Sequence, residues 1–195
     1  MTNSYLIEAP EGPVLVDCAE GTQAWLAGLG KVPIAILLTH QHFDHTMEVA
    51  AIRIASPTPI PVYAHSAFSG ELCMDKLFSS FAGMEINVPE FEVDTLLANQ
   101  SSVEVGGLDL DVFHVPGHSP DSIAFYDKAA GEAYVGDTLM AGSIGRADLP
   151  GGSMPKLKLS IREQLLSLPE ETVVYAGHGG PTDIGRELSS NPFIK

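Results

Sequence analysis

Cysteine and basic residues are both scarce in this sequence of 195 residues. The two cysteines, Cys18 and Cys73, are too few for a disulfide framework and lack the spacing of a thiolate zinc site, so we expect two small buried thiols. Ten Lys and Arg stand against 25 Asp and Glu, which gives a formal charge of −15. Because binding to a phosphate backbone depends on clustered positive charge, this balance argues against nucleic acid as a partner.

Long apolar runs and a leader segment are also lacking. No apolar stretch approaches the length of about 18 residues that a membrane span needs, so no membrane partner is predicted. Met1 to Ser4 carry no positive side chain, and the apolar stretch after them is interrupted at Glu8 and Pro10, so no signal peptide is predicted. We therefore expect a cytoplasmic protein. A hydrophobic content of 45% is typical of a globular chain with a sizeable core.

Short apolar strands recur along the whole chain and alternate with a few helical segments. Residues 66–100 are the least regular part, and they could cover a substrate pocket or simply pack against the core. The predicted strands are 5–7, 14–16, 34–38, 61–64, 103–105, 108–113, 123–126, 133–135 and 172–175; the predicted helices are 21–30, 46–55, a segment from Phe68 to Phe81, and 155–168.

The segment His40-Gln41-His42-Phe43-Asp44-His45 is the most informative feature of the sequence. It places four residues that can bind a divalent metal within six positions, directly after the apolar strand 34–38. Imidazole nitrogen and carboxylate oxygen together suit zinc, iron, manganese or nickel. A rigid strand that ends in such a loop presents its ligands to solvent and substrate, so the segment predicts a metal site.

Three other predicted strands also end close to a residue that can bind metal. His118 follows the strand 108–113, Asp137 follows 133–135, and His178 follows 172–175. A random distribution of 7 histidines would not place ligand types after so many core strands. We therefore expect these residues to join the 40–45 segment in one site.

Four ordered motifs now resemble a known family. T-H-x-H-x-D-H at 39–45, P-G-H-S at 116–119, G-D-T-L at 136–139 and G-H-G at 177–179 resemble the metallo-β-lactamase superfold in its glyoxalase II-like branch. The resemblance implies an α+β fold, a four-layer αβ/βα sandwich of two mixed sheets flanked by helices. It also implies one metallo-hydrolase domain over residues 1–195, without the C-terminal helical extension of full glyoxalase II enzymes.

The resemblance further implies a site for two divalent metal ions, with zinc expected and iron or manganese as alternatives. One metal would have three histidine ligands, the other would have one aspartate and two histidines, and a further aspartate would bridge both. The β-lactamase branches generally lack this bridging aspartate. The implied ligands are His40, His42 and His118 for the first metal, Asp44, His45 and His178 for the second, and Asp137 for both.

The implied activity is hydrolysis of a small thioester, similar to hydroxyacylglutathione, by a metal-bound hydroxide that Asp44 and Asp137 tune as catalytic residues. One alternative is a persulfide dioxygenase, whose relatives use a single iron bound by two histidines and an aspartate. Another is a hydrolase of a different small ester or thioester, and a third is a non-catalytic metal-binding module. A small-molecule thioester is the expected partner.

Several residues outside this ligand set carry weaker expectations. Arg146 matches a basic residue that contacts glutathione in glyoxalase II enzymes, so it is a substrate-binding candidate; a structural salt bridge is the alternative. Asp17, at a strand end, is expected to hydrogen-bond a ligand loop. His65 and His114 are expected in the core or behind the ligands. Family members usually carry one more strand before residue 3, so the sandwich could lack an edge strand.

Overall fold

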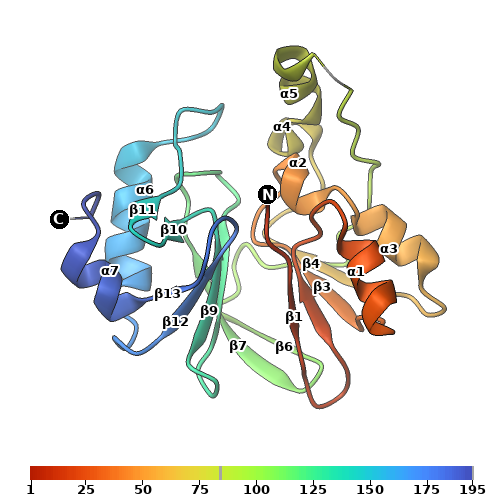
Figure 1. The fold of residues 1–195 in the computed structure, drawn as a ribbon, viewed down its shortest axis with the longest axis horizontal. Coiled ribbons are helices and arrows are strands. Elements are labelled where there is room, and N and C mark those ends of the chain that lie inside the picture. The colour runs from red at the N-terminus through yellow and green to blue at the C-terminus, as the bar shows by residue number, and fades with distance from the viewer. Residues whose placement is uncertain (84, 195) are drawn as a thin grey trace.

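The computed structural model describes residues 1–83 and 85–194. Two β-sheets face each other at the centre of the molecule, and helices cover the outer face of each sheet (Figure 1). A shared core fills the space between the sheets, where Val16 and Leu37 of the first sheet cluster with Val112 and Phe125 of the second. The predicted α+β four-layer sandwich is therefore confirmed.

The first sheet combines an antiparallel hairpin with parallel strands. Its two central strands are buried at every position, as their continuous apolar sequence predicts for strands covered on both faces. Strand β1 pairs antiparallel with β2, and the following neighbours pair in parallel. The strand order is β1 (Tyr5–Ile7), β2 (Val14–Val16), β3 (Ala35–Leu37), β4 (Val62–Ala64) and β5 (Thr95–Leu96).

The second sheet is mostly antiparallel, and β9 and β12 form its parallel pair. A separate two-stranded hairpin follows β9 and consists of β10 (Leu139–Met140) and β11 (Ser143–Ile144). The strand order of the second sheet is β13 (Thr182–Asp183), β12 (Val173–Ala176), β9 (Glu132–Gly136), β8 (Ile123–Asp127), β7 (Leu108–His114) and β6 (Ser102–Val105).

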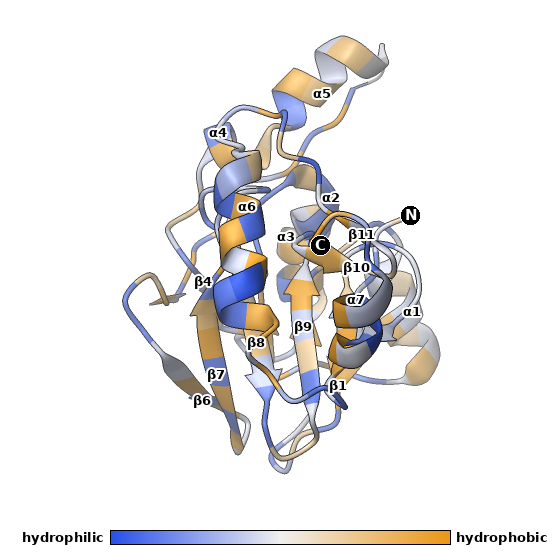
Figure 2. Ribbon diagram, turned by 90° about the vertical axis from the view of Figure 1, so that its left-hand side faces the viewer, coloured by the Kyte–Doolittle hydropathy of each residue, from blue (hydrophilic) through white to orange (hydrophobic). Residues whose placement is uncertain are grey.

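Each outer layer packs on its sheet through one apolar face. Leu26 and Ile52 cluster with the first sheet, and Leu157 and Ile161 cluster with the second. Figure 2 shows hydrophobic and hydrophilic positions alternating along α6, as expected for a helix with one buried face. The helices are α1 (Thr22–Leu29), α2 (Phe43–Thr46), α3 (Val49–Ala55), α4 (Gly70–Cys73), α5 (Asp75–Ala82), α6 (Met154–Ser160), the π-helical segment η1 (Ile161–Leu165) and α7 (Ile184–Ser190).

Three predicted helices differ in detail from the structure. The helix predicted over 46–55 is preceded by α2, so part of the ligand segment is itself helical. The segment from Phe68 to Phe81 forms two helices, because Met74 adopts a left-handed conformation (φ 59°) between them. The helix predicted over 155–168 begins as α6 and continues as the π-helical segment η1. The sequence pattern finds helical character here but not its interruptions.

The remaining general expectations concern thiols, membranes and the first strand. Cys18 and Cys73 are both free and buried, as predicted. None of the helices that the structure describes has the length and apolar character to cross a bilayer. Residues before β1 do not form a further strand, but Thr2 makes an isolated antiparallel bridge to His178.

Candidate metal centre

The seven predicted ligands lie together where four core strands end. The 40–45 segment follows β3, His118 follows β7, Asp137 follows β9, and His178 follows β12. The two sheets bring these chain segments to one edge, although His40 and His178 are far apart in the sequence. Among the described residues, three overlapping groups place their ligand atoms within 4.8 Å of one another: His40, His42 and His118; His40, His45 and Asp137; and Asp44, His45 and His178.

The first group consists of three imidazoles whose nitrogens point toward one another. Nδ1 of His42 lies 3.1 Å from Nε2 of His40 and 2.8 Å from Nε2 of His118. Ligand atoms around a tetrahedral zinc, with bonds of about 2.1 Å, are roughly 3.4 Å apart. These three nitrogens therefore have nearly the spacing of a preformed metal site.

Asp44, His45 and His178 form the group expected for the second metal, called the second group from here on, and it contains a carboxylate and two imidazoles. Oδ2 of Asp44 lies 3.4 Å from Nε2 of His178 and 3.8 Å from Nε2 of His45. His45 is completely buried, whereas Asp44 and His178 are partly exposed. The second group is thus more open to solvent than the first.

Asp137 lies between the two groups. Its Oδ2 is 3.6 Å from Nε2 of His118 and 3.1 Å from Nε2 of His178, while its Oδ1 is 3.3 Å from Nε2 of His45. One carboxylate therefore reaches histidines of both groups. This is the place that the resemblance implies for the bridging ligand.

Hydrogen bonds to the outer ring nitrogens orient four of the five histidines. The hydroxyl of Thr39 donates to Asp17, so its oxygen accepts from Nδ1 of His40 at 3.1 Å. Carboxylate and carbonyl oxygens can only accept, so the other three Nδ1 atoms must also donate. When the ring is neutral, Nε2 of each of these histidines has a lone pair directed into the site. The three hydrogen bonds from Nδ1 to a carboxylate or carbonyl oxygen are those of His45 to Asp17 (2.7 Å), His118 to the Arg146 carbonyl (2.8 Å) and His178 to the Met1 carbonyl (3.1 Å).

Two buried polar atoms test whether the site suits a cation. Nε2 of His45 and Oδ1 of Asp137 are buried, and neither has a hydrogen-bond partner within the described part of the chain. They lie 3.3 Å apart without the geometry of a hydrogen bond. A buried acceptor without a partner is destabilising, and a metal ion between these atoms would satisfy both. The residues present therefore fit metal ions.

The ionisation of these groups also favours positive charge at this place. Burial raises the pKa of the Asp137 carboxyl, but His45 and His178 more than offset this and hold the pKa far below its usual range. Hydrogen bonds to Asp137 and Asp44 raise the pKa of His178 to about 10. By contrast, burial and the neighbouring imidazoles lower the pKa of His42 to about 3, which keeps it neutral. The carboxylates are therefore ionised, and the proton on His178 supplies positive charge at the place where a metal ion would do so.

Asp17 has the place expected of it, behind a ligand loop. It is buried, and its carboxylate accepts from the Thr39 backbone N–H (2.8 Å), the Thr39 hydroxyl (2.8 Å) and His45. Its φ of 58° lies in the left-handed region, which Asp and Asn tolerate better than most residues. The sequence signal was its position at the end of β2.

Several supporting contacts have no signal in the sequence. The hydroxyl of Thr2 donates to Asp44 at 2.7 Å, and the carbonyls of Met1 and Arg146 orient two ligand histidines. Gly177 adjoins the site so closely that an added Cβ would lie 2.5 Å from Cε1 of His45. The contacts of Thr2, Met1 and Arg146 join residues that are distant in sequence, so no local pattern predicts them, whereas Gly177 belongs to the G-H-G motif at 177–179.

The remaining predicted residues lie outside the three groups. The rings of His65 and His114 stack on each other with centroids 4.5 Å apart. His114 is exposed and hydrogen-bonds the Pro120 carbonyl, so the prediction that His114 lies in the core is wrong. Arg146 forms a two-pronged salt bridge with Asp148, at 2.7 and 2.8 Å, with more than half of each side chain exposed. The structural alternative for Arg146 is therefore realised, and contact with a substrate remains a prediction.

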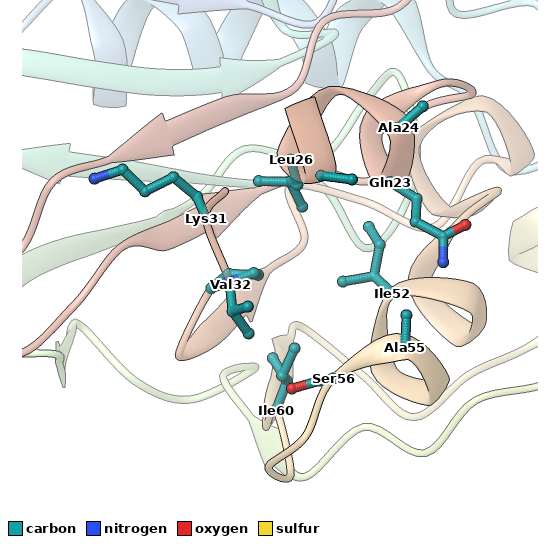
Figure 3. Close-up of a pocket in the computed structure, with 11 residues that line it drawn as sticks. Gln23, Ala24, Leu26, Lys31, Val32, Ile52, Ala55, Ser56 and Ile60 are labelled. Carbon is teal, nitrogen blue, oxygen red and sulfur yellow. The ribbon is translucent and has the colours of Figure 1, made fainter. Parts of the chain in front are cut away.

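A separate cavity of about 400 Å³ lies between α1 and α3 (Figure 3). Leu26, Ile52 and Ile60 contribute apolar side chains to it, while Gln23 and Ser56 contribute polar ones. None of its lining residues belongs to the ligand set. The metal centre and this cavity are therefore distinct features.

Comparison with known proteins identifies related sequences. A family model described as the metallo-beta-lactamase superfamily matches residues 1–178. The chain is 41% identical to the probable metallo-hydrolase YqgX of Bacillus subtilis, over 85% of this chain and 77% of that protein. It is 34% identical to the hydroxyacylglutathione hydrolase GloC of Haemophilus influenzae, over 82% of this chain and 74% of that protein.

Solved structures agree with this relationship. A structure of TTHA1623 in a di-iron-bound form has a TM-score of 0.86 and 41% identity, covering 99% of this chain and 95% of that chain. The structure of the B3 metallo-beta-lactamase BLEG-1 also has a TM-score of 0.86, with 37% identity and coverage of 99% and 94%. Both similarities extend over the whole sandwich.

Proposed function

Because this chain belongs to the metallo-β-lactamase superfamily, we propose that it is a binuclear metal-dependent hydrolase of a small thioester similar to hydroxyacylglutathione. The observation that carries the proposal is the position of Asp137, whose carboxylate reaches histidines of both ligand groups. A shared carboxylate is suited to hold two metal ions close together. The similarity to a hydroxyacylglutathione hydrolase supports a thioester as the substrate.

The ligand set divides into three parts. His40, His42 and His118 would hold one ion; Asp44, His45 and His178 would hold the other; and Asp137 would contact both. Two divalent ions held by these residues would supply Lewis-acid chemistry, which would lower the pKa of a bound water and polarise a substrate carbonyl.

The carboxylates of Asp44 and Asp137 would orient that water through their free oxygen lone pairs. They would also keep the transfer of its proton within the site. No side chain needs to act as a nucleophile. Zinc suits the donors, and iron or manganese would also be accepted.

Three other activities define the controls. A persulfide dioxygenase would require a single iron and would consume oxygen. A hydrolase of a different small ester or thioester would use the same residues on another substrate. Hydrolysis of a β-lactam also belongs among the assays, because BLEG-1 is described as a B3 metallo-beta-lactamase.

The test is to load the protein with zinc, iron or manganese, count the bound ions, and measure hydrolysis of S-lactoylglutathione with and without a chelator. We expect two ions per chain and chelator-sensitive hydrolysis. The variant Asp137→Asn should lose at least about 100-fold in kcat, because it removes the negative charge of the carboxylate that reaches histidines of both groups.

Asp127→Asn is the matched control for this variant. Asp127 is also buried, but it accepts only from the backbone N–H groups of Ala129 and Ala130 in the turn after β8. One bound iron, with oxygen consumption on glutathione persulfide and no hydrolysis, would replace our proposal with the dioxygenase. Two bound ions with turnover only of another ester or a β-lactam would reject the thioester.

A further inference from the structure

A second cavity, of about 450 Å³, lies between α5 and the loop over residues 146–150. Leu77, Phe78 and Phe81 of α5 line one side, and Leu149 and Pro150 line the other. Figure 1 shows α5 standing out from the body of the molecule, close to α2. The volume of the cavity lies within the usual range for pockets that bind small molecules.

Both walls of this cavity are attached to the metal centre. The ring of Phe78 packs on that of Phe43 with centroids 4.9 Å apart, and Phe43 stands between the ligands His42 and Asp44 in the sequence. On the other side, the carbonyl of Arg146 accepts the hydrogen bond that orients His118. A molecule that binds with its reacting carbonyl at the metal centre would therefore have this cavity directly beside it.

The apolar side chains of α5 are more exposed to solvent than is usual for a helix beside a functional site. Leu77 and Phe78 are only partly buried, and Phe81 is 80% exposed. A helix normally packs such residues into a core, whereas here they line a cavity next to a reactive site. An apolar group placed among them would remove this surface from water.

The charged residues of the cavity compensate each other. Arg146 and Asp148 form their salt bridge at its edge, with side chains 55% and 69% exposed. An anionic group would have to compete with Asp148 for the guanidinium. The cavity is therefore better suited to an uncharged apolar group than to a carboxylate.

We propose that this cavity binds an apolar group of the substrate, aliphatic or aromatic, while the metal centre holds the adjoining thioester carbonyl. This inference rests on the proposed function. It makes Phe81 and Leu149 specificity-determining residues, because they would contact the part of the substrate that does not react. The apolar group could belong to the acyl part or to the thiol part, and the two arms of the experiment distinguish these sources.

The experiment measures kcat/KM of the metal-loaded protein on two series of thioesters. In the first, the thiol is glutathione and the acyl chain grows from acetyl to octanoyl. In the second, the acyl group is acetyl and the thiol carries an alkyl chain of increasing length. We expect kcat/KM to rise about fourfold per methylene in one series, the usual effect of burying a methylene group.

The variant Phe81→Ser should flatten that rise, and Ile54→Ser is its matched control. Ile54 is 84% exposed on α3 and lies outside the cavity, so both variants remove an exposed apolar side chain without disturbing a core. A flat response in both series, or an unchanged slope in Phe81→Ser, would overturn the inference.

Binding of non-hydrolysable thioethers, measured by calorimetry, separates this inference from the proposed function. If no thioester is hydrolysed but thioether affinity rises with chain length and falls in Phe81→Ser, the proposed function fails and the apolar cavity stands. If thioesters are hydrolysed at rates independent of chain length, the function stands and the cavity assignment fails.

Discussion

The support of His45 by Asp17 allows a sharp prediction for the substitution Asp17→Asn. Asparagine keeps the size of the side chain and tolerates the left-handed φ of 58°, so the backbone should not change. It replaces Oδ2 with an NH₂ group, which cannot accept from Nδ1 of His45 or from the Thr39 hydroxyl. His45 must then carry its proton on Nε2, which faces Asp137 inside the site.

The size of the effect follows from the bond that is lost. A hydrogen bond to a charged group contributes about 1.5–3 kcal/mol when it is buried, and roughly 1.4 kcal/mol corresponds to a tenfold change in affinity. We therefore expect metal affinity at the group containing His45 to fall about 10- to 100-fold, the usual range for residues that orient metal ligands. The group of His40, His42 and His118 should change less, because Asp17 reaches it only through Thr39.

The assay is competition for zinc against a chromophoric chelator at fixed pH, with hydrolysis measured at limiting and at saturating metal. Asp127→Asn is the control for the loss of a buried carboxylate, and it should leave metal affinity unchanged. Wild-type affinity in Asp17→Asn, or an equal loss in Asp127→Asn, would refute the reasoning.

Three further predictions concern the same site. Thr2→Val removes the hydroxyl that donates to Asp44 and should weaken metal binding roughly fivefold (about 1 kcal/mol), while Thr2→Ser should restore it. Gly177→Ala should abolish metal binding, because its Cβ would lie 2.5 Å from Cε1 of His45; at Gly180 the space is open, so Gly180→Ala should bind normally. Chelation should lower Tm by about 10 °C for each ion lost, since saturating metal stabilises a site by about 4 kcal/mol.

Each of these predictions has a direct check. Metal titration of Thr2→Val beside Thr2→Ser decides whether the hydroxyl acts on Asp44, and equal affinities would exclude it. Circular dichroism and metal counting separate loss of the site from loss of the fold in Gly177→Ala, and a fully loaded variant would contradict the predicted clash. Thermal melting of protein with verified metal loss tests the predicted fall in Tm. An unchanged Tm would show that the ions do not stabilise the fold.

The sheets were largely predictable because their strands have strong local signals. The buried runs around Leu15, Ile36 and Phe125 are apolar over consecutive positions, as strands covered on both faces must be. Two-residue strands such as β5 and β13 are too short to show any periodicity, and they were not predicted. The break at Met74 also went unseen, because nothing in its apolar side chain predicts a left-handed backbone.

The sequence by itself determined the chemistry of the site. Histidine and aspartate are ligand types that suit divalent metals, and the spacing from His40 to His45 is short enough for one segment to carry four of them. Their positions after apolar strands also predicted that they would meet at the ends of rigid elements.

Only the tertiary structure decided how those ligands are held. Thr2 and the carbonyls of Met1 and Arg146, which the sequence did not predict, orient the ligands across separations of up to 177 residues. The physical reason is that a hydrogen bond depends on distance and angle, and a backbone carbonyl has no identity in the sequence. The packing of the two sheets against each other fixes these distances. These distances in turn determine which nitrogen of each histidine faces the metal site.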